Sequence, residues 1–265
     1  MCKFSRFTYT YAIKLSILAL VTAANLYYHL YMALNVASEP KSAVAQDLIL
    51  LSPPDSFSVT DDSSHPSQIS IAKRLIDIIG ATIGLIITAA IAIPVAIATL
   101  LDNPGPIFYS QIRCGDNGKT FRMWKFRSMI VGADQLKHLV KNEANGYIFK
   151  CVEDPRITRI GKFLRRTSLD ELPQFWNVLK GDMSLVGTRP PTPDEVMKYQ
   201  PHHWERLRVK PGITGEWQAN GRSSIKDFEE IVKMDVDYQH KWSVPYDLFL
   251  ISKTIWTVLN KKGAC

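Results

Sequence analysis

An apolar stretch of 27 residues with a proline inside it constrains this chain more than any other feature. Residues 75–101 carry one charged side chain, Asp77, and directly follow a basic pair. A helix needs about 20 apolar residues to cross a bilayer, so this stretch is long enough to span. Pro94 lacks a backbone donor and clashes with the preceding turn, so we expect a kink or break near residues 91–93. The stretch is therefore either a kinked spanning helix or a helix–break–helix that enters one leaflet and returns.

A weaker apolar segment lies near the N-terminus, at residues 15–34, where it includes Asn25 and His29. Its composition fits a weak membrane helix, an interfacial helix or the apolar part of a signal peptide. We favour a membrane segment over cleavage, because the rest of the chain does not have a secreted character. Residues 38–70 are acidic and rich in Ser, Pro and Asp, which predicts a disordered linker.

We therefore divide the chain into an N-terminal membrane or interfacial segment at 1–37, the linker at 38–70 and one folded domain at 71–265. The basic residues before the first apolar segment favour a cytoplasmic N-terminus. Two spanning helices would then return the domain to the cytoplasm, whereas one spanning and one re-entrant helix would leave it outside. This conflict stays open unless the first segment lies flat or inserts with its N-terminus outside.

Positive charge is concentrated in the middle of the chain. The net charge is +7, and residues 113–189 alone contain 15 Lys and Arg against 8 Asp and Glu. Such a block predicts a polyanionic partner: the phosphates of nucleotides, lipid head groups or nucleic acid. A nucleic-acid binder is disfavoured, because no groove-reading motif is present. The four cysteines are scattered without metal-ligand spacing, which argues against a zinc site or a disulfide scaffold.

The domain is predicted to be α+β and predominantly helical. Residues 107–115 and 119–129 are typical of two strands joined by an Asp-Asn-Gly turn, which indicates a small β-hairpin. Residues 156–166 place apolar and basic side chains on opposite faces of a helix, which favours an amphipathic helix on an anionic membrane surface over a core helix with a solvated face. Two further helices are predicted at 227–239 and 246–259.

Two adjacent carboxylates, Asp170 and Glu171, are predicted to lie at the start of a helix near two arginines. Pro173 fits the first position of that helix, which would end at Lys180 before Gly181; a capping box with Ser168 is the alternative. Alone, such acids more often complement the helix dipole than catalyse. Nearby cations keep a carboxylate ionised, as a nucleophile or metal ligand requires.

Arg189 precedes two prolines and is a candidate phosphate clamp, because a guanidinium can engage two phosphate oxygens. Carboxylates and arginines beside a membrane indicate phosphoryl chemistry with Mg²⁺, which prefers one or two carboxylates plus phosphate oxygens. The residues by themselves lead no further than this.

Three motifs carry a resemblance to a known family: DNPGPIFYSQIRCGDNGKTFRMWKFRSM, DPRITRIGKFLRRTSLDELPQFWNVLKGDMSLVGTRP and KPGITGEWQANGRSS. In this order they closely resemble the bacterial sugar transferases, the monotopic polyprenol-phosphate phosphoglycosyl transferases that initiate exopolysaccharide and O-antigen synthesis. The resemblance extends from about residue 73 to the C-terminus.

The resemblance implies transfer of a sugar-1-phosphate from a UDP-sugar to undecaprenyl phosphate, with release of UMP. Asp170 matches the family nucleophile, which forms a covalent phosphosugar intermediate, and Glu171 matches its partner in a dyad that binds Mg²⁺. Arg165 and Arg189 match arginines that contact phosphate. Pro94 matches the proline that breaks a re-entrant membrane helix. The resemblance also implies the bacterial inner membrane, with the catalytic domain on the cytoplasmic face.

The chain departs from the family pattern at Thr188, where a proline is usual, and we expect this to loosen the loop that holds Arg189. The C-terminal part resembles the longer, hexose-1-phosphate members, which favours glucose or galactose over an acetamido sugar. The competing hypothesis is a catalytically silent membrane scaffold for glycan assembly. The sequence leaves the oligomeric state open.

Overall fold

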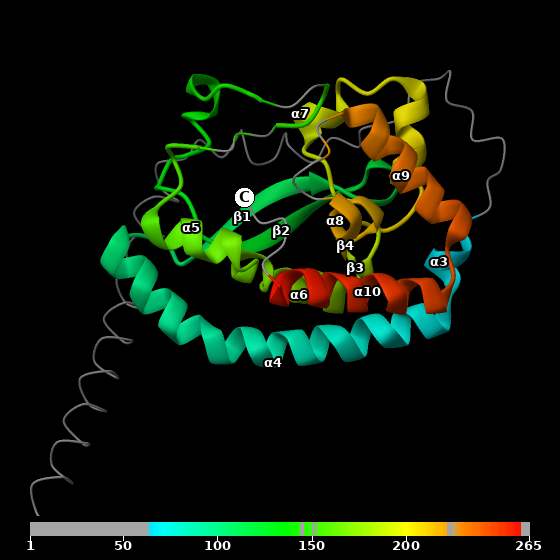
Figure 1. The fold of residues 1–265 in the computed structure, drawn as a ribbon, viewed down its shortest axis with the longest axis horizontal. Coiled ribbons are helices and arrows are strands. Elements are labelled where there is room, and N and C mark those ends of the chain that lie inside the picture. Colours follow the sequence, from blue (N-terminus) through cyan, green and yellow to red (C-terminus); the bar gives the residue numbers. More distant parts are fainter. Residues whose placement is uncertain are drawn as a thin grey trace, which may run out of the picture. The chain divides into compact units, whose positions relative to one another are not determined.

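The computed structural model describes residues 64–260, apart from 144–145, 150, 152, 222–224 and 226. The N-terminal segment and the linker up to residue 63 lie outside the described residues. The described part is mostly helical with two small sheets, so the α+β class is confirmed (Figure 1). Its helices are α3 Pro66–Ile69, α4 Ile71–Asp102, α5 Arg159–Arg166, α6 Gln174–Lys180, α7 Pro193–Val196, α8 Glu216–Gly221, α9 Phe228–Lys241 and α10 Val244–Leu259.

The predicted hairpin is present. Strand β1, Phe108–Cys114, pairs antiparallel with β2, Thr120–Phe126. Asn117 and Gly118 turn the chain between them in left-handed conformations, with φ of 50° and 77°, as an Asn-Gly turn favours. A second sheet was not predicted. It joins β3, Ser184–Val186, to β4, Gly212–Thr214, in parallel, and strands of three residues are too short to show alternation in a sequence.

Helix α4 contains the apolar stretch and runs for 32 residues through Pro94 without interruption. It is about 48 Å long at 1.5 Å per residue, and it curves along one side of the domain (Figure 1). Of the kink or break expected near residues 91–93, the break is absent: the helix is continuous and curves (Figure 1). The next residue, Val95, packs in a core cluster with Phe126 and Leu164. This packing holds the second half of α4 against the domain and offsets the hydrogen bond lost at the proline.

The two faces of α4 are inverted relative to a helix of a water-soluble protein. Among the described residues, α4 is the one helix long and apolar enough to cross a membrane. Its buried side is made of small and polar residues at helical spacing: Lys73, Asp77, Ala81, Gly84, Thr88, Val95 and Thr99. Its exposed side is a row of large apolar residues, among them Ile79, Ile83, Ile86, Ile93, Ile97 and Leu101. An exposed apolar surface of this extent marks a membrane or protein contact.

Both ends of α4 bind the same domain. Near its start, Lys73 Nζ lies 2.5 Å from the Asp247 carboxylate of α10. At its end, the Asp102 carboxylate accepts a hydrogen bond from the Ile160 backbone N–H at 2.9 Å. Between them, α4 packs along α6, and a Cβ at Gly84 would lie only 2.4 Å from the Phe175 ring. The helix therefore lies along the domain instead of projecting away from it.

The folded domain begins earlier than residue 71. Residues 64–70, assigned from the sequence to the linker, include α3 and the capping residue Ser70. The Gln68 side-chain amide donates to the Arg208 carbonyl at 2.6 Å and to the Asp116 carboxylate at 2.8 Å. These contacts fix the end of the predicted linker to the domain.

Candidate active site

The two adjacent carboxylates lie in a short turn between α5 and α6. Asp170 and Glu171 belong to a single 3-10 turn, Leu169–Glu171. The preceding residue, Ser168, has left-handed backbone angles (φ 56°) and not the extended ones of a capping residue, so the capping-box alternative is wrong. Helix α6 begins at Gln174, one residue later than predicted, and ends as predicted at a left-handed Gly181 (φ 93°).

Glu171 forms an ion pair that the sequence did not predict. Lys125 Nζ of β2 lies 3.0 Å from the Glu171 carboxylate, and both side chains are about a quarter exposed or less. Asp170, one residue earlier, is buried, with 6% of its surface exposed. The β1–β2 hairpin therefore holds the partly exposed Glu171 carboxylate through Lys125, whereas Asp170 is buried.

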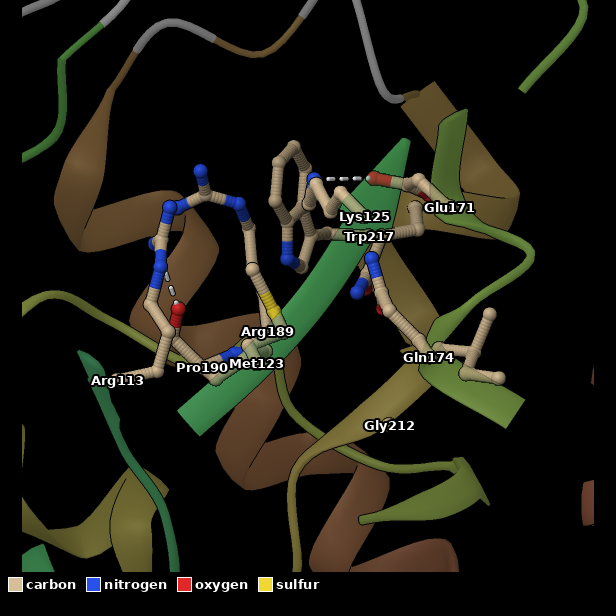
Figure 2. A pocket seen from close by; sticks show the side chains of 11 residues that line it. Arg113, Met123, Lys125, Glu171, Gln174, Arg189, Pro190, Gly212 and Trp217 are labelled. Atoms are coloured by element: carbon tan, nitrogen blue, oxygen red, sulfur yellow. Dashed lines mark hydrogen bonds and ion pairs between the residues drawn. The ribbon is translucent and has the colours of Figure 1, made fainter. Parts of the chain in front are cut away.

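An open pocket lies beside the dyad and encloses about 410 Å³, part of it open to solvent. Figure 2 shows the Lys125–Glu171 pair on one side of it and the guanidinium groups of Arg113 and Arg189 on the other, with the Trp217 indole between them. The pocket thus presents a carboxylate at one end and two cations at the other. The remaining lining residues are Met123, Gln174, Pro190, Gly212, Ile213 and Gln218.

The predicted site residues are not all in this lining. Glu171 and Arg189, which are 18 residues apart in sequence, meet at the pocket, and Asp170 is the neighbour of Glu171. Arg165 does not line the pocket; its Nε donates to the Ser128 hydroxyl at 3.0 Å. The structure therefore supports the grouping of Glu171 with Arg189 and places Arg165 on the helix that leads to the dyad.

Backbone pairing holds the loop that carries Arg189 at Thr188, the position where the sequence departs from the family pattern. Thr188 is buried, and its carbonyl accepts from the Gly212 backbone N–H at 2.8 Å, which extends the β3–β4 pairing. At Gly187, a Cβ would lie 2.1 Å from the Lys210 carbonyl oxygen, so only glycine permits this close approach of two backbones. The pairing uses the carbonyl of residue 188, so it does not depend on the side chain at that position.

A buried ion pair, Arg206–Asp235, lies against the loop that carries Arg189. Arg206 Nη2 lies 2.6 Å from the Asp235 carboxylate and 3.4 Å from the Arg189 carbonyl oxygen. Burial raises the pKa of Asp235 to about 6, although the Arg206 charge acts in the opposite direction. Arg206 thus contacts the backbone of the phosphate-clamp candidate, and Asp235 holds Arg206; neither residue lines the pocket.

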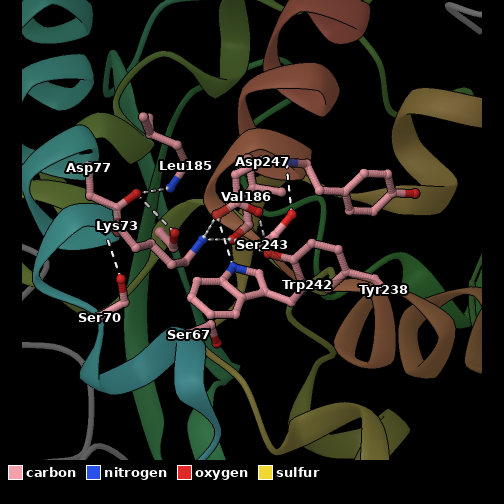
Figure 3. A network of polar contacts seen from close by, with 12 residues as sticks. Ser67, Ser70, Lys73, Asp77, Leu185, Val186, Tyr238, Trp242, Ser243 and Asp247 are labelled. Carbon is pink, nitrogen blue, oxygen red and sulfur yellow. Dashed lines mark hydrogen bonds and ion pairs between the residues drawn. The ribbon is translucent and has the colours of Figure 1, made fainter.

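Charged residues of α4 hold the strand that leads to Arg189 (Figure 3). The Asp77 carboxylate accepts hydrogen bonds from the Ser184 hydroxyl at 2.9 Å and the Leu185 backbone N–H at 2.8 Å. Lys73 Nζ donates to the Val186 carbonyl at 2.9 Å. Helix α4 therefore holds strand β3, and the segment that follows this strand carries Arg189 and Pro190 to the pocket. Asp77 is the only charged residue in the 27-residue apolar stretch, and its isolation was a sequence signal that it contacts the rest of the domain.

Of the described residues, His202, His203 and Glu229 also group closely enough to hold a metal ion. However, the Nδ1 atom of His203 accepts a hydrogen bond from the Gln200 backbone N–H at 3.0 Å. The ring proton must then be on Nε2, which donates to Glu229 at 2.7 Å. A protonated nitrogen cannot bind a metal, so this group is a hydrogen-bonded pair at the start of α9.

Mg²⁺ prefers carboxylate and phosphate oxygens, so the adjacent carboxylates Asp170 and Glu171 are the residues that would hold this ion together with a phosphate. A pocket with a few convergent polar groups is the usual place where a protein binds a small molecule.

The chain matches the model of one family, described as bacterial sugar transferase, over residues 68–261. It belongs to the bacterial sugar transferase family.

Named relatives agree with this assignment. Galactosyl transferase CpsE of Streptococcus agalactiae serotype III (strain NEM316) is 55% identical over 196 residues, which cover 73% of this chain and 43% of the relative. Undecaprenyl-phosphate galactose phosphotransferase of Salmonella typhimurium is 41% identical over 198 residues, covering 72% and 41%. Exopolysaccharide production protein ExoY of Rhizobium meliloti is 34% identical over 200 residues, covering 73% and 88%. The matched part is thus less than half of the first two relatives and most of the third.

Proposed function

We propose that this chain transfers a sugar-1-phosphate from a UDP-sugar to undecaprenyl phosphate and releases UMP. The observation that carries the proposal is the pocket that brings Glu171 and Arg189 together beside Asp170. Relatives whose names include a galactose phosphotransferase and a glucose-1-phosphate transferase acting on undecaprenyl phosphate support the reaction class.

Two displacements at one phosphorus atom account for the reaction. The Asp170 carboxylate attacks the phosphorus that bears the sugar; a P–O bond forms to Asp170, and the P–O bond to UMP breaks. An oxygen of undecaprenyl phosphate then attacks the same phosphorus and releases Asp170. Arg189 contacts phosphate oxygens and stabilises the negative charge that develops on them. Asp170 and Glu171 would hold Mg²⁺, which when bound neutralises charge on the diphosphate and the departing UMP.

A panel of UDP-sugars tests the proposal. We expect the purified protein in detergent, with Mg²⁺ and undecaprenyl phosphate, to release UMP from UDP-glucose or UDP-galactose faster than from UDP-N-acetylhexosamines. The preference for a hexose follows the names of the relatives. Without undecaprenyl phosphate, the first displacement should release only about one UMP per enzyme; continued release in that control would measure hydrolysis. If the protein releases no UMP from any of these UDP-sugars but still binds membranes, the scaffold hypothesis is favoured.

We also propose that α4 does not cross the bilayer but lies in one leaflet, with the domain on the cytoplasmic face. Support comes from the contacts at both ends of α4 to one domain and from its outward apolar row. Helix α10 adds exposed apolar residues, including Phe249 and Trp256, and tryptophan favours the membrane interface.

Thiol labelling checks this arrangement. Single cysteines at Ser64, before α4, and Lys119, after it, are both at exposed positions. In inside-out membrane vesicles lacking the other accessible cysteines, a membrane-impermeant reagent is expected to label both equally. In right-side-out vesicles it should label neither. Labelling of the two positions from opposite sides would show that α4 spans the membrane.

A further inference from the structure

The pocket has a second arginine at its cationic end, Arg113, which none of the sequence arguments singled out. Arg113 lies near the end of β1 and is nine-tenths buried, with 9% of its surface exposed. One terminal nitrogen donates to the Pro190 carbonyl at 3.0 Å and the other to the Gln111 side chain at 2.8 Å. Its third nitrogen, Nε, is buried with no hydrogen-bond partner. The side chain is thus held in place while its buried Nε–H has no partner.

Two arginines close together are electrostatically unfavourable unless an anion joins them. Burial, and then the charge of Arg189, lower the pKa of Arg113 to about 10. Glu195 and Asp194 act in the opposite direction but do not outweigh these two causes. A buried charge that is not compensated is costly, so the arrangement favours a ligand with several negative charges.

Other unused polar atoms are in the same place. Six buried side-chain nitrogen or oxygen atoms of the described residues have no hydrogen-bond partner, and three of them belong to residues that line this pocket. Besides Arg113 Nε they are the Trp217 indole nitrogen, a donor, and the Gln218 side-chain oxygen, an acceptor. Buried polar groups normally find partners, so their concentration here indicates a site for a polar ligand.

We propose that Arg113 binds phosphate together with Arg189, so that the two guanidinium groups form one clamp for the diphosphate of the donor. The inference rests on the proposed function for the identity of that donor. The hydrogen bond from Arg113 to Pro190, the residue after Arg189, ties the two arginines to one loop. The clamp therefore keeps its spacing, and a diphosphate with two adjacent charged groups fits it better than a single phosphate.

Binding measurements on the full-length protein in detergent test the clamp, with UDP and inorganic pyrophosphate as probes in the presence of Mg²⁺. Arg113→Gln is expected to weaken the binding of both probes by roughly 10- to 100-fold, the range for a hydrogen bond to a charged group. It should also flatten the dependence of affinity on salt, because one charge of the clamp is gone. Arg122→Gln is the matched control, since Arg122 is an exposed arginine on the paired strand.

Arg113→Lys separates binding from support of the loop. Lysine keeps the positive charge but has a single nitrogen, so it cannot reach both the Pro190 carbonyl and the Gln111 side chain as the two terminal guanidinium nitrogens do. A phosphate clamp predicts that Arg113→Lys recovers part of the affinity and the wild-type salt dependence. If Lys and Gln are equally impaired with unchanged salt dependence, or if Arg113→Gln binds both probes normally, the inference is wrong.

The experiments distinguish failure of the Arg113–Arg189 clamp from failure of the proposed sugar-1-phosphate transfer. Pyrophosphate contains no nucleoside, so weaker pyrophosphate binding by Arg113→Gln supports the clamp even if no UDP-sugar is turned over. Normal UMP release with wild-type donor KM by Arg113→Gln overturns the clamp and leaves the proposed function standing. A wild-type protein that binds neither probe also overturns the clamp.

Discussion

Replacing Asp170 by asparagine is expected to reduce UMP release by roughly 10⁴-fold or more, because an amide cannot act as the attacking carboxylate. The substitution preserves shape, and Asp170 lies in a turn whose backbone it does not change. Folding and membrane binding should therefore be unaffected. A stopped assay with intact-protein mass spectrometry measures both the rate and the added mass of a sugar phosphate on the enzyme.

Asp134→Asn is the matched control, because Asp134 is exposed and lies outside the pocket. It should retain the wild-type rate and the covalent adduct. A near-normal rate in Asp170→Asn would remove Asp170 from the role of nucleophile. A lost rate with the adduct still formed would place Asp170 in the second displacement instead.

The second large effect is expected from breaking the buried ion pair between α4 and α10. Lys73 and Asp247 side chains are only 6% and 4% exposed. Asp247→Leu leaves the Lys73 charge buried without its partner, which costs about 3–5 kcal/mol of unfolding free energy. Because Lys73 also binds the Val186 carbonyl of β3, we expect donor binding to weaken as well. Chemical unfolding in detergent and the KM for the donor measure the two effects.

The double variant Lys73→Met/Asp247→Leu is expected to recover part of the lost stability, because the Lys73 charge is no longer buried without its partner. Recovery stays incomplete because the Tyr238 hydroxyl and the Trp242 indole still lack the Asp247 carboxylate that accepts their hydrogen bonds. Lys137→Met is the control, since the Lys137–Asp194 pair is exposed (38% and 52%) and such pairs contribute less than about 1 kcal/mol. Equal losses in the exposed and buried pairs would contradict this assignment. A double variant as unstable as Asp247→Leu would do so too.

Local patterns in the sequence predicted the local structure well. Two strand-like segments and the Asp-Asn-Gly turn between them correctly predicted the β1–β2 hairpin, and Gly181 correctly marked the end of α6. Of the kink or break expected near Pro94, the break does not occur, because a proline rule considers one helix alone. In the fold, the tertiary packing of Val95 keeps the helix continuous.

The candidate site was predictable only where its residues are close in sequence. Asp170 and Glu171 are adjacent and were found, but Lys125 lies 46 residues before its partner Glu171. Arg113 and Trp217 reach the pocket from β1 and α8, and only the fold brings them together. The parallel β3–β4 pairing, which places Arg189, has no signature in strands of three residues.

The inverted faces of α4 have a consequence for handling this protein. Deleting the helix to obtain a water-soluble enzyme would remove Asp77, Ala81 and Val95 from contacts inside the domain. The apolar outer row makes no such contribution, so it is the part that can be redesigned. Exchanging outward isoleucines such as Ile83 and Ile86 for glutamine, with the inner face untouched, is the rational route to a soluble version. One face of α4 thus packs inside the domain, and the opposite face presents the apolar surface.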